Sequence, residues 1–299
     1  MRKVVILAIV MLMMMQVSAS TRRALVIGIG KYPASSGWAV INGDKDIPVV
    51  VEMLTMNGYQ HENITTLCNE QATKRQIRAS IRHLAEISQP GDRVYIHFSG
   101  HGQQGVDVHG DETDDDNDNM DEAWIPYDAQ ARYVEGKYEG ENHILDDELY
   151  NWFSAIKKKI GSKGHLTVSV DACHSAGSTR GAATEDSVCI RGELADGSRG
   201  LDAVFKAVRS WFSQDETPVP GNKRKLKWTV ISACKSRQCN REYRGRGSLT
   251  TALREMAEQL GSMTGTQVRT KVLQWMNANL GSGVQQPIIE SEKENSSFF

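Results

Sequence analysis

The chain has 299 residues, of which 39% are hydrophobic and 24% charged, and its formal net charge is -2. This length is sufficient for one large α/β domain with a sizeable core, or for two small domains. A nearly neutral charge balance gives no reason to expect nucleic acid or an anionic membrane surface as a partner.

The first twenty residues differ in kind from the rest. The stretch "MRKVVILAIVMLMMMQVSAS" has a basic start, a central apolar run and small residues at its end. This is the pattern of a secretory signal peptide, and we expect cleavage after Ala19 or Ser20. A membrane anchor is the alternative, but the apolar run is short for a membrane span. The pattern therefore predicts a signal peptide over 1–20, an exported protein (periplasmic or extracellular) and no stable membrane anchor in the mature form.

Beyond this segment, strand patterns alternate with amphipathic helical patterns. The strand patterns, several of them continuous apolar runs typical of strands covered on both faces, lie at 23–30, 63–68, 93–98, 165–170 and 227–233. The helical patterns lie at 46–57, 73–85, 146–156, 249–260 and 268–276, and Thr73 and Gln76 form a capping box for the second of them. A last short strand at 287–290 is expected to close the sheet. This alternation predicts an α/β fold with a mainly parallel central sheet flanked by helices.

The least regular part of the chain is 178–227. It is rich in Gly, Ser and Arg, with one short amphipathic piece at 201–212. We interpret it as a long mobile insertion within a single domain over 21–299, because a loop of this length in a compact domain is usually a functional or linker segment.

Two of the predicted strands end in residues that carry chemistry. "VYIHFSGHGQQG" places His101 between two glycines, and "HLTVSVDACHSAGS" leads into Cys173. Functional groups gather at the carboxyl ends of parallel strands, and a cysteine nucleophile needs an imidazole from elsewhere in the sequence. Each residue alone is more often a packing residue, but the two together predict a catalytic dyad. His174 is a weaker candidate base, because adjacent side chains of an extended strand point to opposite faces.

The same strand ends offer oxyanion donors. Small residues around His101 free the N–H of Gly102 to point at a substrate oxygen, and the N–H of Cys173 is the second predicted donor. The chain has five cysteines, so in an oxidising compartment at least one thiol is left unpaired or intermolecular. Their spacing does not predict a zinc site. Cys234 and Cys239 could pair, but their spacing does not decide it.

Acidic residues lie beside the predicted dyad. Asp171 is two residues before Cys173 and so faces the same side of the strand, Asp46 begins a helix just beyond the first strand, and Ser99 precedes the turn at His101. Two converging carboxylates suit a guanidinium or an ammonium group. The alternative is that Asp46 is only a helix N-cap and Asp171 only a structural hydrogen-bond acceptor.

These residues also carry a resemblance to a known family. "SGHG" and "DACHSAG", together with "ALVIGIGKY", "INGDKD", "DEAWIPYD", "ILDDEL" and "ISACKSRQCNREYRGRGSLTTAL" in that order, resemble the caspase-like cysteine peptidases of clan CD, most closely the metacaspases. The resemblance covers about 23–260. It implies a caspase-hemoglobinase-like three-layer sandwich and an endopeptidase that acts on proteins or peptides. It also implies that His101 and Cys173 are the dyad, and that Asp46, Ser99 and Asp171 form the S1 pocket for Arg or Lys.

The acidic segment "DETDDDNDNMDE" (111–122) suggests calcium, because hard cations favour carboxylate oxygens. Its spacing is similar to that of an EF-hand, but Asp116 stands where the glycine of that loop belongs, so an EF-hand is not predicted. The resemblance implies calcium ligands at Asp121, Asp146 and Asp147. A fourth aspartate of the family is replaced here by Arg180, whose charge opposes a cation. We therefore expect no required cofactor, and a solvated acidic loop remains the alternative to a calcium site.

The insertion after the predicted nucleophile is basic. It holds Arg180, Arg191 and Arg199 and the run "KRK" at 223–225, and members of the family often cut such a linker themselves. A basic linker beside a pocket for basic residues is therefore expected either to be cut by the enzyme itself or to block the pocket, and the sequence does not single out which arginine is used. Two other classes of function stay open: a non-catalytic binding protein with the same fold, and a secreted calcium-binding module.

Overall fold

The computed structural model describes residues 20–106, 120–132, 134, 136–172, 227–235, 238–291 and 297–299. Its centre is a six-stranded sheet in the order β11-β8-β7-β3-β1-β2. Neighbouring strands are parallel except at the β11 edge, where β11 pairs antiparallel with β8. The strands are β1 (Arg22–Gly28), β2 (Ile64–Cys68), β3 (Arg93–Ser99), β7 (His165–Asp171), β8 (Thr229–Ser232) and β11 (Ile288–Glu290). The predicted mainly parallel sheet, closed by the strand near 287–290, is confirmed.

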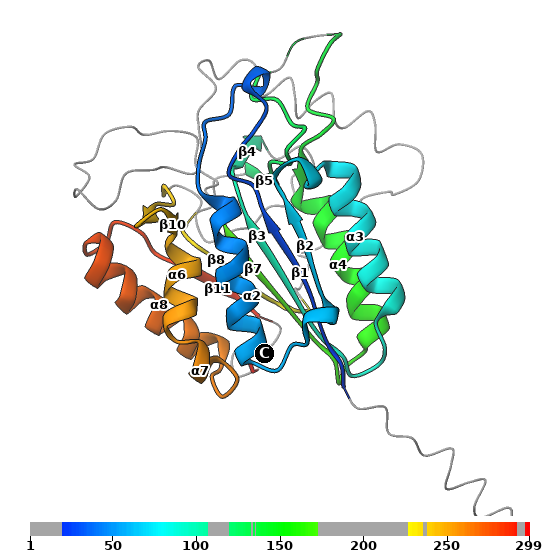
Figure 1. Ribbon diagram of the computed structural model, residues 1–299, viewed down its shortest axis with the longest axis vertical. Coiled ribbons are helices and arrows are strands. Elements are labelled where there is room, and N and C mark those ends of the chain that lie inside the picture. The colour runs from blue at the N-terminus through cyan, green and yellow to red at the C-terminus, as the bar shows by residue number, and fades with distance from the viewer. Residues whose placement is uncertain are drawn as a thin grey trace, which may run out of the picture.

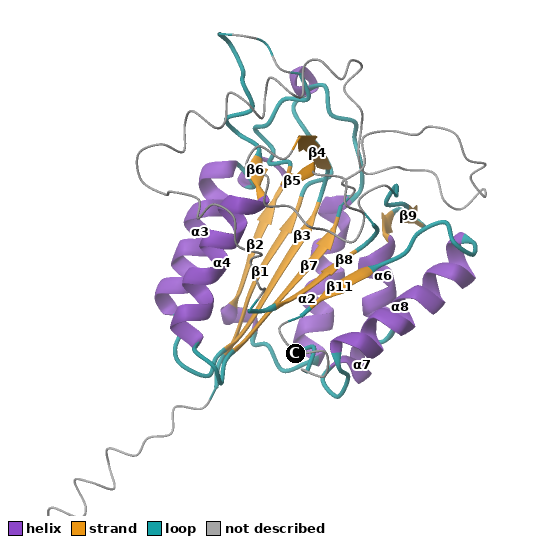
Figure 2. Cartoon of the chain, turned by 180° about the vertical axis from the view of Figure 1, so that it is seen from behind, coloured by secondary structure: helices purple, strands orange, loops and turns teal. Residues whose placement is uncertain are grey.

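Helices cover both faces of this sheet (Figures 1 and 2). One face carries α3 (Lys74–Ile87) and α4 (Asp146–Ile160). The opposite face carries α2 (Asp46–Met56), α6 (Ser248–Glu255), α7 (Ala257–Leu260) and α8 (Gly265–Leu280). The fold is thus the three-layer α/β sandwich that the alternating pattern predicts.

Short elements sit around the carboxyl ends of the strands. A small antiparallel sheet has the order β4-β5-β6, and a hairpin pairs β9 with β10. Their bounds are β4 (Gly102–Val106), β5 (Met120–Trp124), β6 (Ile144–Leu145), β9 (Glu242–Tyr243) and β10 (Arg246–Gly247). Single 3-10 turns are found at Ala34–Ser36, Gly43–Lys45, His61–Asn63 and Asn69–Gln71.

The β9–β10 hairpin was not expected from the sequence. Its two central residues, Arg244 and Gly245, both have positive φ angles, 51° and 72°. Two such residues between paired strands make a type I′ turn, whose twist matches that of the strands. The guanidinium carbon of Arg244 lies 5.0 Å from the ring centre of Tyr243. The hairpin leads directly into α6, so its turn sets where that helix begins.

Helix boundaries follow the sequence with one correction. The Thr73 cap is confirmed, because its Oγ1 accepts the N–H of Gln76 at 3.2 Å. The single helix expected over 249–260 is wrong. At Met256 the backbone leaves the helical region (φ -105°, ψ 15°), which divides the segment into α6 and α7. Both pieces turn apolar residues toward the core, so the apolar spacing continues across a break that it does not detect.

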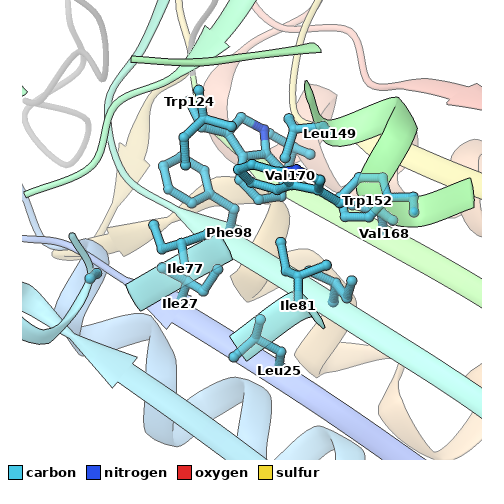
Figure 3. Packing of buried hydrophobic residues seen from close by; sticks show 14 of the residues in the cluster. Leu25, Ile27, Ile77, Ile81, Phe98, Trp124, Leu149, Trp152, Val168 and Val170 are labelled. Atoms are coloured by element: carbon cyan, nitrogen blue, oxygen red, sulfur yellow. The ribbon is translucent and has the colours of Figure 1, made fainter. Parts of the chain in front are cut away.

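On the face of the sheet that carries α3 and α4, the strands contribute apolar side chains to the core (Figure 3). Every second residue of the central strands points to this side, as strand geometry requires. Phe98 and Trp124 stack with ring centres 4.5 Å apart and planes 8° from parallel. The buried strand residues on this face include Leu25, Ile27, Ile96, Phe98, Val168 and Val170, and they pack with Ile77, Ile81, Leu149 and Trp152 of the helices.

The opposite face has a second core. Ala24, Val26, Tyr95 and Ile231 of the strands pack with buried residues of α2, α6 and α8. The C-terminal Phe298 and Phe299 lie in this core as well, with the ring of Phe299 5.3 Å from that of Tyr95. This face therefore combines apolar packing with the polar residues described below.

Several sequence predictions fall outside the described residues. These include the signal peptide, of which only Ser20 is described, the insertion over 178–227, of which only Lys227 is described, and the acidic segment as far as residue 119. Within the described residues, no helix is both long and apolar enough to cross a bilayer.

Candidate active site

The sheet brings the two chemistry-bearing strand ends side by side. β3 and β7 are parallel neighbours, and Ser99 at the end of β3 is in register with Asp171 at the end of β7. His101 follows Ser99 by two residues, and Cys173 follows Asp171 by two residues. Cys173 lies outside the described residues, so its side chain and backbone N–H are not placed.

His101 is fully buried and held from three sides. Its ring stacks on Trp38 and contacts Tyr32, with ring centres 5.1 Å apart in both pairs. Its backbone N–H donates to the Tyr32 hydroxyl at 3.0 Å, and that hydroxyl donates to the Ile125 carbonyl at 3.1 Å. These contacts fix both the backbone and the ring plane of His101.

The hydrogen bond of the His101 ring sets its tautomer. Nε2 lies 2.9 Å from the carbonyl oxygen of Ala39. A carbonyl can only accept, so Nε2 must carry the proton, and in the neutral ring Nδ1 is then the basic nitrogen. The sequence pattern gave no indication of Ala39, because its contribution is a backbone atom.

The glycine that precedes His101 has a packing reason. A Cβ on Gly100 would lie 2.9 Å from Cζ of Phe98 and 3.1 Å from the Tyr32 hydroxyl, so a side chain there would displace the residues that hold His101. Gly102 is buried and begins β4, in register with Trp124 of β5. The predicted oxyanion donor therefore starts a strand directly after the histidine.

Asp46 and Ser99 are in direct contact. Ser99 Oγ donates to Asp46 Oδ2 at 2.5 Å, and the backbone N–H of Gly247 lies 3.0 and 3.2 Å from the two carboxylate oxygens. Both side chains are fully buried. Asp46 is the first residue of α2 and Lys45 is the N-cap, so the alternative that Asp46 is only an N-cap is wrong.

Asp171 is also fully buried and accepts hydrogen bonds from Asn240 and Thr250. Asn240 Nδ2 donates to Oδ1 at 2.7 Å, while the N–H and the hydroxyl of Thr250 donate to Oδ2 at 2.7 and 2.6 Å. The carboxylate of Asp171 therefore has a structural role as a hydrogen-bond acceptor. A Cβ on Gly247 would lie 2.0 Å from Oδ2, so only glycine lets the hairpin backbone approach this carboxylate.

The residues that hold these carboxylates were not predicted from the sequence. Asn240, Gly247 and Thr250 come from one segment, and Gln285 supports it from the far side. Gln285 Nε2 donates to Asn240 Oδ1 at 2.9 Å and to Ser248 Oγ at 2.8 Å. The sequence signal that could have found them is Gly247, a glycine in a polar segment directly before a helical pattern. Such a glycine indicates that the backbone comes close to another group, but it does not identify that group.

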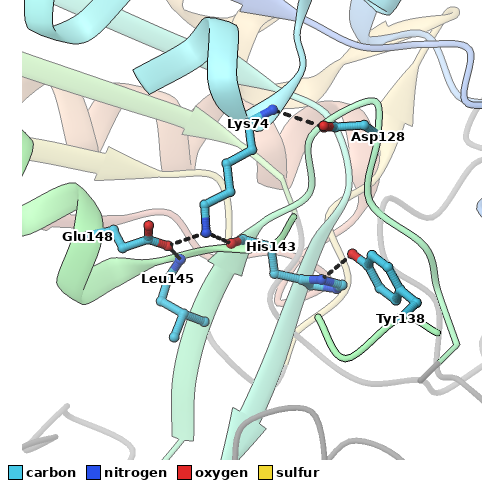
Figure 4. Close-up of polar contacts among 6 residues, drawn as sticks. All are labelled: Lys74, Asp128, Tyr138, His143, Leu145 and Glu148. Atoms are coloured by element: carbon cyan, nitrogen blue, oxygen red, sulfur yellow. Dashed lines mark hydrogen bonds and ion pairs between the residues drawn. The ribbon is translucent and has the colours of Figure 1, made fainter. Parts of the chain in front are cut away.

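Two of the three predicted calcium ligands lie at the start of α4. Asp146 and Asp147 occupy its first turn and are half-buried, whereas Glu148 is buried. Glu148 accepts a hydrogen bond from Lys74 Nζ at 2.8 Å, and the same amine donates to the His143 carbonyl at 2.7 Å (Figure 4). This partly buried contact joins α3 to α4 and places the first turn of α4.

In the described part of the chain, no group of three His, Cys, Asp or Glu side chains is arranged to hold a metal ion. The side chain of Asp121 is not described, although β5 contains its backbone. Asp146 and Asp147 alone supply too few of the six to eight oxygens that Ca²⁺ takes. The described donor set therefore does not fit a calcium ion on its own.

His143 is a buried histidine that the sequence did not single out. Its Nδ1 lies 3.0 Å from the Tyr138 hydroxyl, and its Nε2 lies 2.9 Å from Gln103 Oε1, two residues after His101. Burial, reinforced by the nearby Lys74 ammonium, lowers the pKa of His143 to about 4. At neutral pH this histidine is a neutral bridge between the 138–143 loop and β4.

Cys234 and Cys239, whose pairing the sequence left open, do not form a disulfide with each other. Cys234 is buried, and its Sγ lies 3.2 Å from the Gln238 carbonyl. The segment that begins at Asn240 is therefore not fixed by a disulfide between Cys234 and Cys239.

Comparison with protein families gives a match to the metacaspase peptidase C14 domain over residues 22–179. Among curated proteins, the chain is 31% identical over 161 residues to metacaspase-1 of Eremothecium gossypii, covering 52% of this chain and 32% of that protein. It is 26% identical over 265 residues to metacaspase-1 of Candida albicans, covering 78% of this chain and 56% of that protein. The chain thus spans less than two thirds of the length of each of these relatives.

Solved structures support the fold. A crystal structure of a Geobacter sulfurreducens protein has a TM-score of 0.64 at 22% identity, covering 93% of this chain and 96% of that one. Caspase-1 from Spodoptera frugiperda has a TM-score of 0.56 at 14% identity, covering 91% and 87%. The sandwich is therefore a caspase-like fold. The family match covers more than half of the sequence, and the chain belongs to the metacaspase family of C14 cysteine peptidases.

Proposed function

We propose that this chain is a cysteine endopeptidase that cleaves proteins or peptides after Arg or Lys, with His101 and Cys173 as its dyad. The observation that carries the proposal is the register of β3 and β7. It pairs Ser99 with Asp171, two residues before His101 and Cys173 respectively. Family membership supports the cysteine nucleophile, and the buried carboxylates of Asp46 and Asp171 support the basic preference.

In this mechanism the Cys173 thiol transfers its proton to Nδ1 of His101, and the thiolate attacks the scissile carbonyl. The N–H groups of Gly102 and Cys173 stabilise the oxyanion. The imidazolium then gives its proton to the leaving amine, which leaves an acyl-enzyme. Water attacks the thioester with His101 as the base, and the released thiol ends the cycle. The Ala39 carbonyl keeps Nε2 protonated throughout, so Nδ1 is the nitrogen that carries the exchanged proton.

Charge supports the preference for a basic P1 residue. Among the described residues, the donors to Asp46 and Asp171 include the Ser99 hydroxyl, the Asn240 amide, the Thr250 hydroxyl and backbone N–H groups, all of them neutral. An ionised carboxylate only accepts hydrogen bonds, so a cationic substrate group suits this pair. A guanidinium or ammonium group that meets them would form charge-assisted hydrogen bonds.

The test is a panel of peptides that differ only at P1, with Arg, Lys, Asp or Leu. Wild-type enzyme should cleave after Arg and Lys and not after Asp. Asp171→Asn and Asp46→Asn should each lower kcat/KM for the Arg peptide by about 10- to 150-fold, because each weakens a hydrogen bond to a charged group. Wild-type enzyme that prefers Asp or Leu at P1 would refute the pocket.

Asp92→Asn is the matched control for that panel. Asp92 is a buried carboxylate just before β3, at the opposite end of the strand from Ser99, and it pairs with Arg23 at 2.9 Å. This variant should lose stability but keep the ratio of Arg to Leu cleavage. A changed ratio in Asp92→Asn would mean that the panel reports general damage to the sheet.

Self-processing belongs to the same proposal. Arg180, Arg191, Arg199 and the basic run at 223–225 are the candidate sites, and all lie outside the described residues. Mass spectrometry of purified wild type should show cleavage after one of these residues. Cys173→Ala should stay intact; a Cys173→Ala chain cut at the same bond would assign the cut to another protease.

We further propose an exported enzyme that does not need calcium. N-terminal sequencing of the secreted chain should begin at residue 20 or 21, and an intact N-terminus would contradict the signal peptide. Activity should change little between a chelator and millimolar calcium, while Arg180→Asp should raise the sensitivity to calcium. Micromolar calcium binding by the wild type, with activity lost on chelation, would overturn the calcium proposal.

A further inference from the structure

A buried polar stripe runs along β3 and β7 on the face that carries α6. The strands alternate, so Tyr95, His97 and Ser99 point to this side while Val94, Ile96 and Phe98 point to the other. Ser169 and Asp171 do the same on β7, with Ser169 in register with His97. These polar side chains are fully buried. Buried polar groups are costly unless they are hydrogen-bonded, so this stripe must have a bonding pattern.

That pattern is a continuous chain of hydrogen bonds that ends on the proposed S1 carboxylate. The Tyr95 hydroxyl lies 2.7 Å from Ser169 Oγ, and Ser169 Oγ lies 2.7 Å from His97 Nδ1. On the other side of the ring, His97 Nε2 lies 3.4 Å from Thr250 Oγ1, and this hydroxyl lies 2.6 Å from Asp171 Oδ2. The chain links β3, β7 and α6.

Only one order of donors satisfies every member of the chain with a neutral imidazole. An ionised Asp171 can only accept, so the Thr250 hydroxyl donates to it and turns its lone pairs toward His97. Nε2 of His97 therefore donates, and Nδ1 accepts from Ser169. Ser169 Oγ then accepts from the Tyr95 hydroxyl. Burial raises the pKa of Tyr95 well above its usual range, so this hydroxyl keeps the proton that it donates.

A neighbouring threonine shows what Thr250 would otherwise do. Thr251, the next residue of α6, donates its hydroxyl to the Gly247 carbonyl at 2.8 Å, one turn earlier. This is the usual bond of a helical threonine. The Thr250 hydroxyl instead points into the sheet, between His97 and Asp171. A donor at His97 Nε2 favours that rotamer, because it supplies a partner for the hydroxyl lone pairs.

We propose that His97 is a positioning residue for P1 recognition, which orients Asp171 through the hydroxyl of Thr250. The inference rests on the proposed basic S1 pocket and deepens it. His97 does not touch the substrate or the dyad in this scheme. It holds the second donor to Oδ2, and thereby the orientation of the carboxylate that the guanidinium meets.

The experiment separates the pocket from the dyad with two measurements. Cleavage of the Arg-P1 peptide reports both, while the rate at which iodoacetamide alkylates Cys173 reports the dyad alone, since this probe has no P1 group. His97→Leu keeps the volume and removes both ring hydrogen bonds, and Thr250→Val removes the hydroxyl. Each should lower kcat/KM for the Arg peptide by about tenfold or more, mainly through KM. The alkylation rate should stay within about twofold of the wild type.

Matched variants complete the design. Thr251→Val is the control for Thr250→Val, because it makes the same chemical change at the next residue of α6. Val168→Ala weakens the same strand on its other face, and neither variant should change KM for the Arg peptide. His97→Gln retains an amide donor and should recover part of the loss seen in His97→Leu. The double variant His97→Leu with Thr250→Val should be no worse than the poorer single variant, because both act through one hydroxyl.

The outcomes are distinguishable. Wild type that fails to cleave the Arg peptide overturns the proposed function and this inference with it. Active wild type with unchanged KM in His97→Leu and Thr250→Val overturns the inference alone. Cleavage and alkylation that fall together would assign His97 a purely structural role. If His97→Leu does not fold, Thr250→Val decides the question against its Thr251→Val control.

Discussion

The two faces of the central sheet are built from the same strands but differ in chemistry. Toward α3 and α4, β3 presents Val94, Ile96 and Phe98. Toward α2 and α6, the same strand presents Tyr95, His97 and Ser99, which are buried and hydrogen-bonded. Because side chains alternate along a strand, one seven-residue segment serves both purposes.

Stability and the proposed function therefore depend on different faces of the same sheet. The apolar face is stabilised by burial, which is non-directional and tolerates other apolar residues of similar size. The polar face depends on hydrogen bonds with fixed partners, so an isosteric change there removes a specific contact. Substitutions on the apolar face should therefore lower the free energy of unfolding, whereas substitutions on the polar face should change the cleavage of peptides that differ at P1.

The largest effect is expected at the strand end beside the polar face. Cys173→Ala should reduce peptidase activity to background, because it removes the proposed nucleophile. His101→Ala should lower kcat by about 10²- to 10⁴-fold, because it removes the proposed base. Steady-state assays with the Arg peptide, together with circular dichroism to show that the fold remains, provide the measurement. Cys173→Ala that still cleaves at the wild-type rate would show that the nucleophile is another residue.

The largest loss of stability is expected on the apolar face. Phe98→Ala removes a fully buried ring stacked on Trp124 and should lower the free energy of unfolding by about 3–5 kcal/mol. The preference among P1 residues should not change. Urea unfolding and the peptide panel measure the two quantities, with Phe98→Leu as the milder variant. A Phe98→Ala enzyme that folds but loses its Arg preference would break the proposed separation of the two faces.

A smaller, pH-dependent effect is expected at His143. Its pKa is about 4 in the folded protein and about 6.5 when exposed, so the unfolded chain binds the proton first as pH falls. Stability is therefore fully present above pH 6.5 and is lost as pH falls toward about 4, with a loss of about 2 kcal/mol between pH 7 and pH 5. Chemical denaturation at both pH values should show this loss in the wild type and less of it in His143→Gln.

The exposed His61 offers the control for that measurement. It lies in a 3-10 turn between α2 and β2, away from the contacts of His143. His61→Gln should show the same pH dependence of stability as the wild type. If His143→Gln also keeps the full dependence, groups other than His143 are responsible for it.

The smallest effect is expected at the ion pair between α2 and α6. Arg254 Nη2 lies 2.5 Å from Glu52 Oε1, but their side chains are 34% and 57% exposed. Such exposed pairs contribute little to stability. Arg254→Ala should leave the melting temperature unchanged within error. Arg23→Ala, which leaves the buried carboxylate of Asp92 without its cation, should lower the melting temperature clearly. Equal shifts in the two variants would contradict this ranking.

The sequence was a good guide to elements and strand ends. Apolar runs and helical spacing predicted the strands and helices of the sandwich, since burial imposes a period of two on strands and about 3.6 on helices. It also pointed to His101, Asp46, Ser99 and Asp171, because functional groups of parallel sheets lie at the carboxyl ends of strands. The structure brings Asp46 to Ser99, and the register pairs Ser99 with Asp171.

The sequence did not predict the partners that hold these groups. Asn240 and Thr250 bond to Asp171 across 69 and 79 residues, and Gly247 reaches Asp46 across 201. Periodicity reports which side of an element is buried and carries no information on which distant atom will meet it. The break at Met256 and the β9–β10 turn were missed for a related reason. Each depends on a few backbone angles that leave the apolar spacing intact.

The alternation of polar and apolar residues in "VYIHFS" and "LTVSVD" is a property of the sequence, and it determines that one face of β3 and β7 is polar. Whether that polar face meets water or other donors was decided only when α6 packed against it and placed Thr250 between His97 and Asp171. The physical reason is that burial follows from local periodicity, whereas a buried hydrogen bond needs a partner at the right distance and angle. Only the tertiary structure brings that partner within reach.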